Sequence, residues 1–228
     1  MDVFGKSLLD YHHRELNSKL WLYNNYGPPE EMPVDVFFRP EDEMPELELV
    51  AMNLAAGKIL DIGAGVGSHA LALQNRGADV TALEISAAAC EIMKARGINH
   101  VVNADIFSFK DERFDTLLLL MNGIGLTGTL AGLRKFLEYA KLLLNPGGCM
   151  IFDSSDISYL YEDIPLPADR YFGEIAYRYE YKGQFGDWFN WLYIDQDLLR
   201  KIAVSEGWTT EVLFEDEMDQ YLVRLRLR

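Results

Sequence analysis

A glycine-rich segment at residues 59–67 limits what this chain can fold into more than any other feature. It reads Ile-Leu-Asp-Ile-Gly-Ala-Gly-Val-Gly, an apolar strand that ends near an acid and leads through three glycines into a helix. Glycine has no Cβ, so the backbone can turn sharply there and a ligand can approach closely. The first N–H groups of the following helix have no partner within the helix. The segment therefore predicts a ligand-binding loop between a strand and a helix.

The spacing of these glycines narrows the class of ligand. The pattern is Asp-x-Gly-x-Gly-x-Gly, whereas dinucleotide-binding folds carry Gly-x-Gly-x-x-Gly. The carboxylate of Asp61 would repel a pyrophosphate at this position, and it suits a cationic or hydroxyl-bearing part of a ligand. An oxidoreductase that uses a nicotinamide cofactor is therefore disfavoured.

Strands and helices alternate along the middle of the chain. We expect strands at residues 59–62, 79–84, 100–103, 114–121 and 149–154, and helices at 68–76, 86–96 and 129–144. The segment 114–121 is almost continuously apolar, which is typical of a strand covered on both faces. Regular alternation of this kind predicts an α/β fold with a doubly wound, mostly parallel sheet.

The two ends of the chain follow other patterns. An apolar stripe predicts one helix over residues 3–25, and a second helix is expected over 46–55. Near the other end, aromatic and polar residues alternate over 174–182, which predicts the first strand of an inserted β-hairpin. The second strand of this hairpin is expected at 188–194. A helix from 196 to 205 and two strands that pair antiparallel, at 209–214 and 221–227, complete the expected elements.

Composition excludes several classes of partner. Asp and Glu number 36 against 21 Lys and Arg, a formal charge of -15, so the surface repels nucleic acid and anionic membranes. The two cysteines, Cys90 and Cys149, make no disulfide framework, and the first residues lack the apolar run of a signal peptide. We therefore expect a cytoplasmic protein. The four histidines have no metal-ligand spacing, so no metal site is predicted.

The motifs together resemble the class I S-adenosylmethionine-dependent methyltransferases. The first motif of that family matches Leu60-Asp-Ile-Gly-Ala-Gly-Val-Gly67, and the later ones match Leu83-Glu-Ile-Ser86, Asn103-Ala-Asp-Ile106, the strand after Arg113-Phe-Asp115, and Leu144-Asn-Pro-Gly-Gly148. The resemblance covers about residues 46–154 and the final two strands. It implies a seven-stranded sheet whose last strand is antiparallel, and S-adenosyl-L-methionine as the cofactor.

This resemblance gives each part of the chain an expected place in a single domain, 1–228. The parts are an amino-terminal helix and cap segment at 1–45, a cofactor-binding core at 46–154, the inserted hairpin at 171–194, and a carboxy-terminal helix with the last two strands at 195–228.

Acids at strand ends are the main candidates for cofactor contacts. Glu84 ends the second strand, where an acid in doubly wound folds accepts hydrogen bonds from ribose hydroxyls. The resemblance implies that Asp105 binds the adenine amino group, with Ile106 against the ring, and that Asp61 lies near the methionine amino group. It also suggests that Arg39 holds the methionine carboxylate; a surface ion pair is the alternative. The predicted cofactor-binding residues are Arg39, Asp61, Gly63, Ala64, Gly65, Gly67, Glu84, Ile85, Asp105, Ile106, Met121 and Asn122.

The acceptor of the methyl group is harder to predict than the cofactor. Met121-Asn-Gly-Ile-Gly125 departs from the Asn/Asp-Pro-Pro-aromatic motif of enzymes that methylate DNA or protein amides, so a small-molecule acceptor is expected. No catalytic residue is assigned; His69 is a candidate base, but packing is its expected role. A non-catalytic cofactor-binding module or partner subunit is the alternative function, and either a monomer or a homodimer fits the sequence.

Aromatic residues of the hairpin leave two interpretations open. Tyr177, Tyr179, Tyr181, Trp188 and Trp191 either form an apolar wall over the substrate, as part of a lid, or pack against the amino-terminal helix or a dimer partner.

Overall fold

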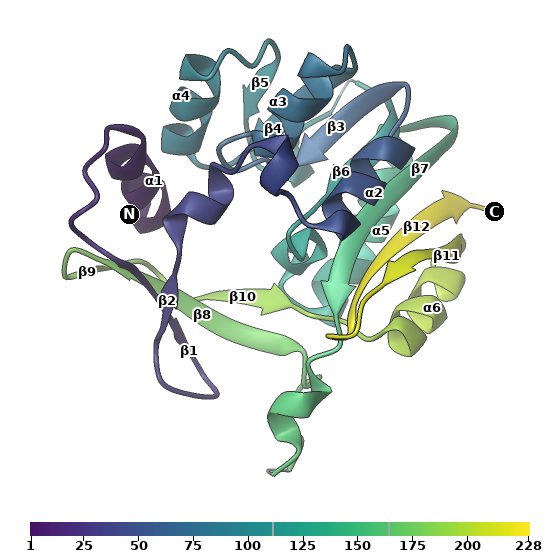
Figure 1. The fold of residues 1–228 in the computed structure, drawn as a ribbon. Coiled ribbons are helices and arrows are strands. Elements are labelled where there is room, and N and C mark those ends of the chain that lie inside the picture. The colour runs from purple at the N-terminus through teal and green to yellow at the C-terminus, as the bar shows by residue number, and fades with distance from the viewer. Residues whose placement is uncertain (111, 164) are drawn as a thin grey trace.

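The computed structural model describes residues 1–110, 112–163 and 165–228, and Figure 1 shows two sheets in this part of the chain. The larger, called here the core sheet, has seven strands in the order β11-β12-β7-β6-β3-β4-β5. Its strands are β3 (Lys58–Ile62), β4 (Asp79–Glu84), β5 (Val101–Asn103), β6 (Phe114–Leu119), β7 (Leu144–Ser155), β11 (Trp208–Glu215) and β12 (Gln220–Leu227). Strands β3 to β7 are parallel, and β12 is antiparallel to both of its neighbours. The predicted fold class is confirmed.

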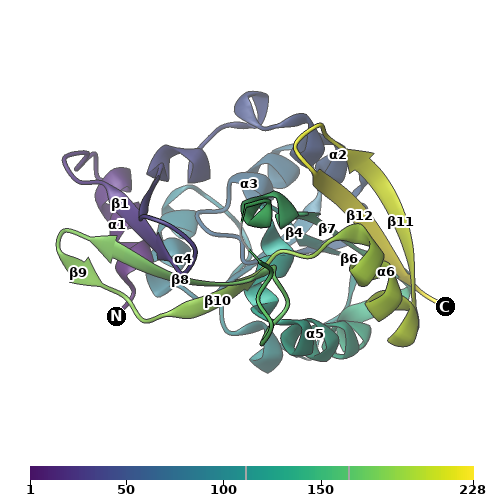
Figure 2. The same ribbon diagram turned by 90° about the horizontal axis from the view of Figure 1, so that it is seen from below.

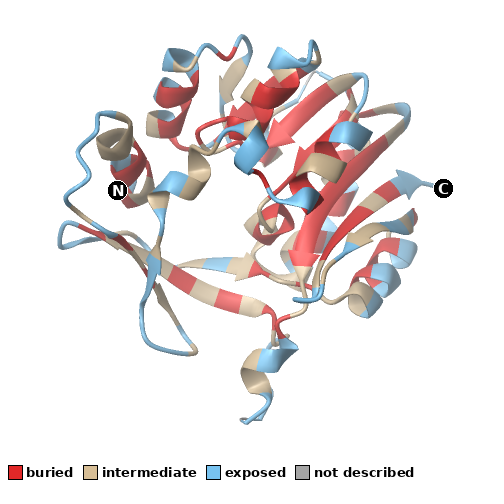
Figure 3. Cartoon of the chain, viewed as in Figure 1, coloured by how far each residue is buried: buried red, intermediate tan, exposed pale blue. Residues whose placement is uncertain are grey.

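Helices cover both faces of the core sheet, as Figure 2 shows. One face carries α2 (Glu46–Leu54), α3 (Ser68–Asn75) and α4 (Ala87–Ala95), and the other carries α5 (Leu130–Leu143) and α6 (Gln196–Ser205). Successive residues of β6 enter different clusters: Leu117 and Leu119 pack on the side of α5, and Leu118 packs on the opposite side. This two-sided burial, visible along the central strands in Figure 3, explains the continuous apolar run.

A second sheet lies beyond the carboxyl ends of the parallel strands (Figure 1). Its order is β10-β8-β1-β2, with β9 paired to β8. The strands are β1 (Leu20–Asn24), β2 (Glu30–Met32), β8 (Glu174–Tyr181), β9 (Gln184–Phe185) and β10 (Phe189–Leu192). The expected hairpin is present, because β10 pairs antiparallel with β8 and places Phe189 opposite Tyr177.

The single helix predicted over residues 3–25 is wrong. Helix α1 covers only Val3–His12; the backbone turns at Arg14, which has a φ of 66°, and the chain then enters β1. Leu20 and Leu22 are buried at a spacing of two, and they pair with Tyr181 and Tyr179 of β8. This partner lies far along the chain, and its pairing overrides the local helical pattern.

Two short 3₁₀ turns connect the second sheet to the core. They are η1 (Val34–Phe37) and η2 (Glu41–Glu43), and they lead from β2 to α2. Three further 3₁₀ turns, η3 (Ile106–Ser108), η4 (Gly123–Thr127) and η5 (Ser158–Tyr161), follow β5, β6 and β7. The loops after β3, β4, β5 and β6 thus open at the edge of the core sheet where ligands bind in parallel α/β folds.

A buried tyrosine joins the end of the hairpin to the core sheet. The hydroxyl of Tyr221 donates to the Ile194 carbonyl at 2.6 Å, and the Ile194 N–H donates to Ser154 Oγ at 3.0 Å. We expect Tyr221→Phe to lower the free energy of unfolding by about 1–3 kcal/mol, because a buried carbonyl loses its donor. Urea denaturation measures the change. In the control Tyr159→Phe, at a tyrosine 55% exposed, the change should stay within about 0.5 kcal/mol; equal effects would contradict the assignment.

Candidate functional site

The glycine loop between β3 and α3 has the backbone that its sequence predicts. Gly63, Gly65 and Gly67 have φ values of 73°, 55° and 78°, in the left-handed region that favours glycine. A Cβ at Gly67 would lie 2.1 Å from Ile98 Cδ1, so this glycine is needed for packing. A Cβ at Gly65 would meet nothing within 4 Å. Gly65 therefore faces open space, as a residue approached closely by a ligand must.

Glu84 connects the end of β4 to this loop. Its Oε2 accepts a hydrogen bond from the Gly65 N–H at 2.9 Å, and its Oε1 accepts one from the Ser86 N–H at 2.8 Å. Burial raises the pKa of the Glu84 carboxyl, and the Ser86 and Gly65 amides act in the opposite direction. The structure thus brings together two of the predicted residues, Gly65 and Glu84.

The residues after β4 and β5 differ in exposure. Ile85 is 69% exposed, although its side chain is apolar, while Ile106 is buried. Asp105 is exposed, and its Oδ1 accepts a hydrogen bond from the Phe107 N–H at 2.8 Å. The Asn103 side chain donates to the Glu84 and Ile85 carbonyls, both at 2.9 Å, which holds the ends of β4 and β5 side by side.

Met121 and Asn122 lie in a strained turn after β6. Both have positive φ, 63° and 54°, a conformation that costs non-glycine residues free energy and is often found at functional sites. Buried Asp153 supports the turn by accepting from the Asn122 N–H at 2.8 Å. Ser155 Oγ donates to Asn122 Oδ1 at 2.9 Å, and Gln220 Nε2 donates to Asp153 at 2.8 Å.

Sequence reasoning did not identify Asp153. Burial raises the pKa of this carboxyl to about 6, although the Asn122 amide and the Gln220 side chain oppose the shift. An acid in the otherwise apolar strand 149–154 was the available signal, because buried acids are rare without a specific partner.

Asp61 is buried between the glycine loop and α3. Burial raises the pKa of its carboxyl to about 6, against the charge of His69. Within the described part of the chain, Asp61 Oδ2 has no hydrogen-bond partner. A buried carboxylate oxygen of this kind requires a donor or a cation.

Arg39 does not contact the glycine loop. It forms an ion pair with Glu48 of α2, as the alternative prediction had it, but with an acid that is buried while Arg39 itself is partly exposed. Glu48 also accepts a hydrogen bond from His69 Nε2–H at 2.7 Å. The ring nitrogen of His69 is thus already bound to a carboxylate. Glu48 was missed, because an acid near the start of a helix is ordinarily exposed.

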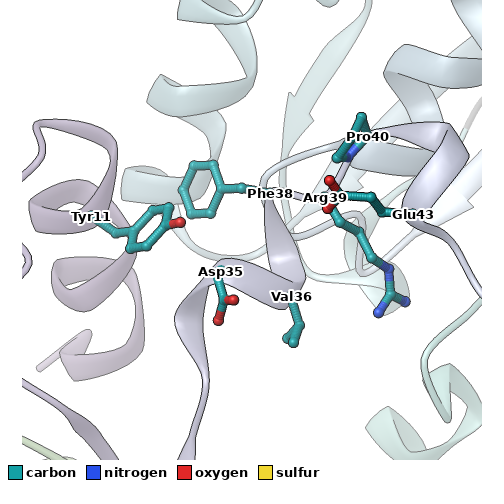
Figure 4. Close-up of a pocket in the computed structure, with 7 residues that line it drawn as sticks. All are labelled: Tyr11, Asp35, Val36, Phe38, Arg39, Pro40 and Glu43. Carbon is teal, nitrogen blue, oxygen red and sulfur yellow. The ribbon is translucent and has the colours of Figure 1, made fainter.

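Arg39 also lies at a surface pocket of about 470 Å³, shown in Figure 4. The pocket is lined by Tyr11, Asp35, Val36, Phe38, Arg39, Pro40 and Glu43. None of these residues belongs to the glycine loop or to β4, so the pocket is separate from the group formed by Gly65 and Glu84.

Aromatic residues of the second sheet reach the same edge of the core. Tyr179 stacks on Phe4 of α1 at a centroid distance of 5.0 Å. Trp191 packs so closely on η4 that a Cβ at Gly125 would lie 1.9 Å from its Nε1. Trp188 is exposed and lies beside Arg178. The side chain of Arg178 alternates with those of the tyrosines along β8, so Trp188 lies on the other face of the strand from Tyr177 and Tyr179, and not with them in one wall.

Two negative findings concern the described residues alone. In residues 1–110, 112–163 and 165–228, no helix is long and apolar enough to cross a membrane. The same residues contain no group of three or more histidine, cysteine or acidic side chains that could hold a metal ion.

Comparison with known proteins adds to this geometry. A family model described as a methyltransferase domain matches residues 60–152. No curated protein matches the chain significantly. The solved structure of an S-adenosylmethionine-dependent methyltransferase from Bacteroides fragilis, in complex with S-adenosyl-L-homocysteine, is 39% identical, with a TM-score of 0.91. The match covers 99% of this chain and 94% of that one.

More distant structures share the fold. The CcbJ methyltransferase from Streptomyces caelestis is 16% identical, with a TM-score of 0.63, and the match covers 85% of this chain and 95% of that one. An amino pentose methyltransferase from Micromonospora echinaspora is 18% identical, with a TM-score of 0.57 and coverage of 79% and 87%. The glycine loop, the strand order and the close similarity to the Bacteroides protein lead to one conclusion: this chain belongs to the S-adenosylmethionine-dependent methyltransferases.

Proposed function

We propose that this methyltransferase binds S-adenosyl-L-methionine across the ends of β3, β4 and β5 and transfers the methyl group to a small-molecule acceptor. The observation that carries the proposal is the open space in front of Gly65, next to the carboxylate of Glu84. The structural relative at 39% identity is described as a complex with S-adenosyl-L-homocysteine, the demethylated product of this cofactor.

Each predicted residue has a proposed part in binding the cofactor. Glu84 accepts hydrogen bonds from the ribose hydroxyls, and the open loop at Gly63, Ala64 and Gly65 lets the cofactor approach the backbone. Gly67 allows the close packing that supports the loop. Exposed Ile85, buried Ile106 and Asp105 contact the adenine, while Met121 and Asn122 border the methionine end.

The methionine end of the cofactor suits two further groups. Asp61 Oδ2 is buried without a partner in the described residues, so the ammonium group of the cofactor would satisfy it. Arg39 is proposed to bind the methionine carboxylate in addition to Glu48, with which its guanidinium forms an ion pair.

The reaction requires alignment more than a strong base. The bound cofactor supplies an activated methyl group on a sulfonium sulfur. The residues of this chain hold that group in line with the acceptor, and such positioning can account for about 7–11 kcal/mol of a barrier. Tyr179, Trp191 and α1 cover the site and exclude water. The excess of acids and the two reduced, buried cysteines support a small-molecule acceptor and a cytoplasmic location.

Helix α1 and the second sheet are proposed to act together as a lid. Asp2, the N-cap of α1, accepts a hydrogen bond from Ser86 Oγ at 2.5 Å, two residues from Glu84. Phe4 of the same helix stacks on Tyr179 of β8. Both covering elements therefore meet beside the proposed ribose site, whether the protein is a monomer or a homodimer.

The first prediction tests the open space at Gly65. Gly65→Ala should reduce the affinity for S-adenosyl-L-homocysteine at least about tenfold, because the new methyl group enters the cofactor's place. Calorimetry measures the affinity. Gly77→Ala is a matched control: Gly77 has a φ of 84°, also with nothing within 4 Å, so it carries the same backbone strain away from the loop. Equal affinities in the two variants would refute the assigned loop.

The second prediction tests the ribose contact. Glu84→Gln should weaken binding of S-adenosyl-L-homocysteine about 10- to 150-fold, since a charge-assisted hydrogen bond is worth about 1.5–3 kcal/mol. Glu91→Gln removes an equal charge from the exposed side of α4 and should leave the affinity unchanged. If both variants bind like the wild type, the ribose lies elsewhere.

The third prediction concerns the lid. Amide hydrogen exchange in Val3–His12 and Glu174–Tyr181 should slow when S-adenosyl-L-homocysteine is bound, because a covering element opens less often over an occupied site. Mass spectrometry of exchanged peptides measures the rates. Exchange rates that are the same with and without the ligand, but that fall as the protein concentration rises, would instead indicate a dimer interface.

A further inference from the structure

Three side chains from separate segments are joined by hydrogen bonds, and the charge of one of them, His69, acts on a fourth, Asp61. Arg39 comes from the segment between η1 and η2, Glu48 from α2, Asp61 from β3 and His69 from α3. Glu48 lies at the centre: one carboxylate oxygen accepts from Arg39 and the other accepts from His69 at 2.7 Å. The side chains of Glu48 and His69 are only 6% and 8% exposed.

Contacts within this group determine its charge state. Burial alone would raise the pKa of the Glu48 carboxyl, but His69 and Arg39 outweigh burial and lower it. Burial alone would also lower the pKa of His69, but the hydrogen bond to Glu48 and the charges of Asp61 and Glu48 outweigh it and raise it. Glu48 is therefore a carboxylate, and His69 favours the imidazolium form.

The group holds two carboxylates, Glu48 and Asp61, and two cations, Arg39 and protonated His69. Asp153 of β7 is a further buried acid, and the charge of Glu48 contributes to its raised pKa. A buried charge is costly unless it is paired or hydrogen-bonded. Asp61 Oδ2 is buried without a hydrogen-bond partner among the described residues, so its charge is the least compensated in the group.

The place of His69 is not explained by the ion pair alone. Arg39 already supplies a counter-charge to Glu48, so His69 adds a second buried cation, and it is the one that acts on Asp61. An apolar side chain would fill the same space with a smaller desolvation cost. The histidine therefore indicates a requirement on the charge of Asp61.

We infer that Glu48 and His69 are positioning residues for the cofactor: His69, held by Glu48, keeps Asp61 ionised so that its free oxygen can bind the ammonium group of S-adenosyl-L-methionine. The inference rests on the proposed function, because it assigns Asp61 to the cofactor's amino group. Neither Glu48 nor His69 touches the cofactor in this arrangement; both act through Asp61.

The inference predicts a characteristic pH dependence. Wild-type affinity should be constant at high pH and fall as Asp61 takes up a proton, near pH 6. In His69→Gln, which lacks the imidazolium, the pKa of Asp61 should be higher by about one unit or more, since a neighbouring charge shifts the pKa of a carboxyl by about 1–3 units. The charges of Arg39, Glu48 and Asp153 remain in place in this variant and act on Asp61 as before.

Calorimetric titration with S-adenosyl-L-homocysteine from about pH 5.5 to 8.5 tests this shift in His69→Gln. We expect affinity close to wild type at the highest pH and affinity about threefold or more below wild type at pH 6.5, because the pH at which affinity falls moves upward. His100→Gln, which changes an exposed histidine, should follow the wild-type curve.

Other outcomes separate the hypotheses. A loss of affinity that is equal at every pH, or curves that coincide with the wild type, would overturn the inference and leave the proposed function standing. Wild-type protein that binds no S-adenosyl-L-homocysteine would instead refute the proposed function. Histidine NMR of the unliganded wild type provides a measurement that needs no variant: the pKa of His69 should lie above the ordinary value for histidine, and a lower pKa would overturn the inference.

Discussion

The contact between Glu84 and the Gly65 N–H is the interaction on which the site depends. It joins the acid that ends β4 to the loop that follows β3, so the two strands share one rigid edge. Glycine at this position has no side chain to fill the space in front of the loop. The same carboxylate accepts from Ser86, the N-cap of α4, so strand, loop and helix are fixed by a single side chain.

Around this contact the protein keeps acids in places where they are unfavourable for stability. The pKa values of Asp61 and Asp153 are raised to about 6 by burial, above the ordinary value for aspartate. A raised folded-state pKa means that the folded protein binds protons more readily than the unfolded chain. Ionisation of these groups therefore destabilises the fold above about pH 6, and the effect disappears as pH falls toward about 4. A cationic ligand relieves the same cost, which links the electrostatics of these buried acids to the positive charge of the proposed cofactor.

Local patterns were enough to predict the core sheet and its loops. The strands β3, β4 and β6 and the helices between them follow from apolar runs, glycines and N-caps that lie within a few residues of each other. Prediction failed where the partner was distant. Leu20 and Leu22 looked helical beside their sequence neighbours, but β1 pairs with β8, far along the chain. Likewise, the role of Glu48 depends on Arg39, on His69 and on the depth of α2, none of which its own helix reveals.

The pairing of β1 with β8 changes how the covering elements must be understood. The sequence suggested an amino-terminal helix over 3–25 and a hairpin as separate parts of a lid, but the later part of that helix segment forms β1, which lies between β8 and β2 in one sheet with the hairpin. Removal of the amino-terminal residues through β1 would therefore expose an edge of β8 and leave Tyr179 and Tyr181 without Leu22 and Leu20 opposite them. The strands of the proposed lid belong to the second sheet, whereas the cofactor contacts proposed at Gly65 and Glu84 belong to the core sheet. Because the two are carried by different sheets, substitutions in the strands of the proposed lid need not alter the proposed cofactor contacts.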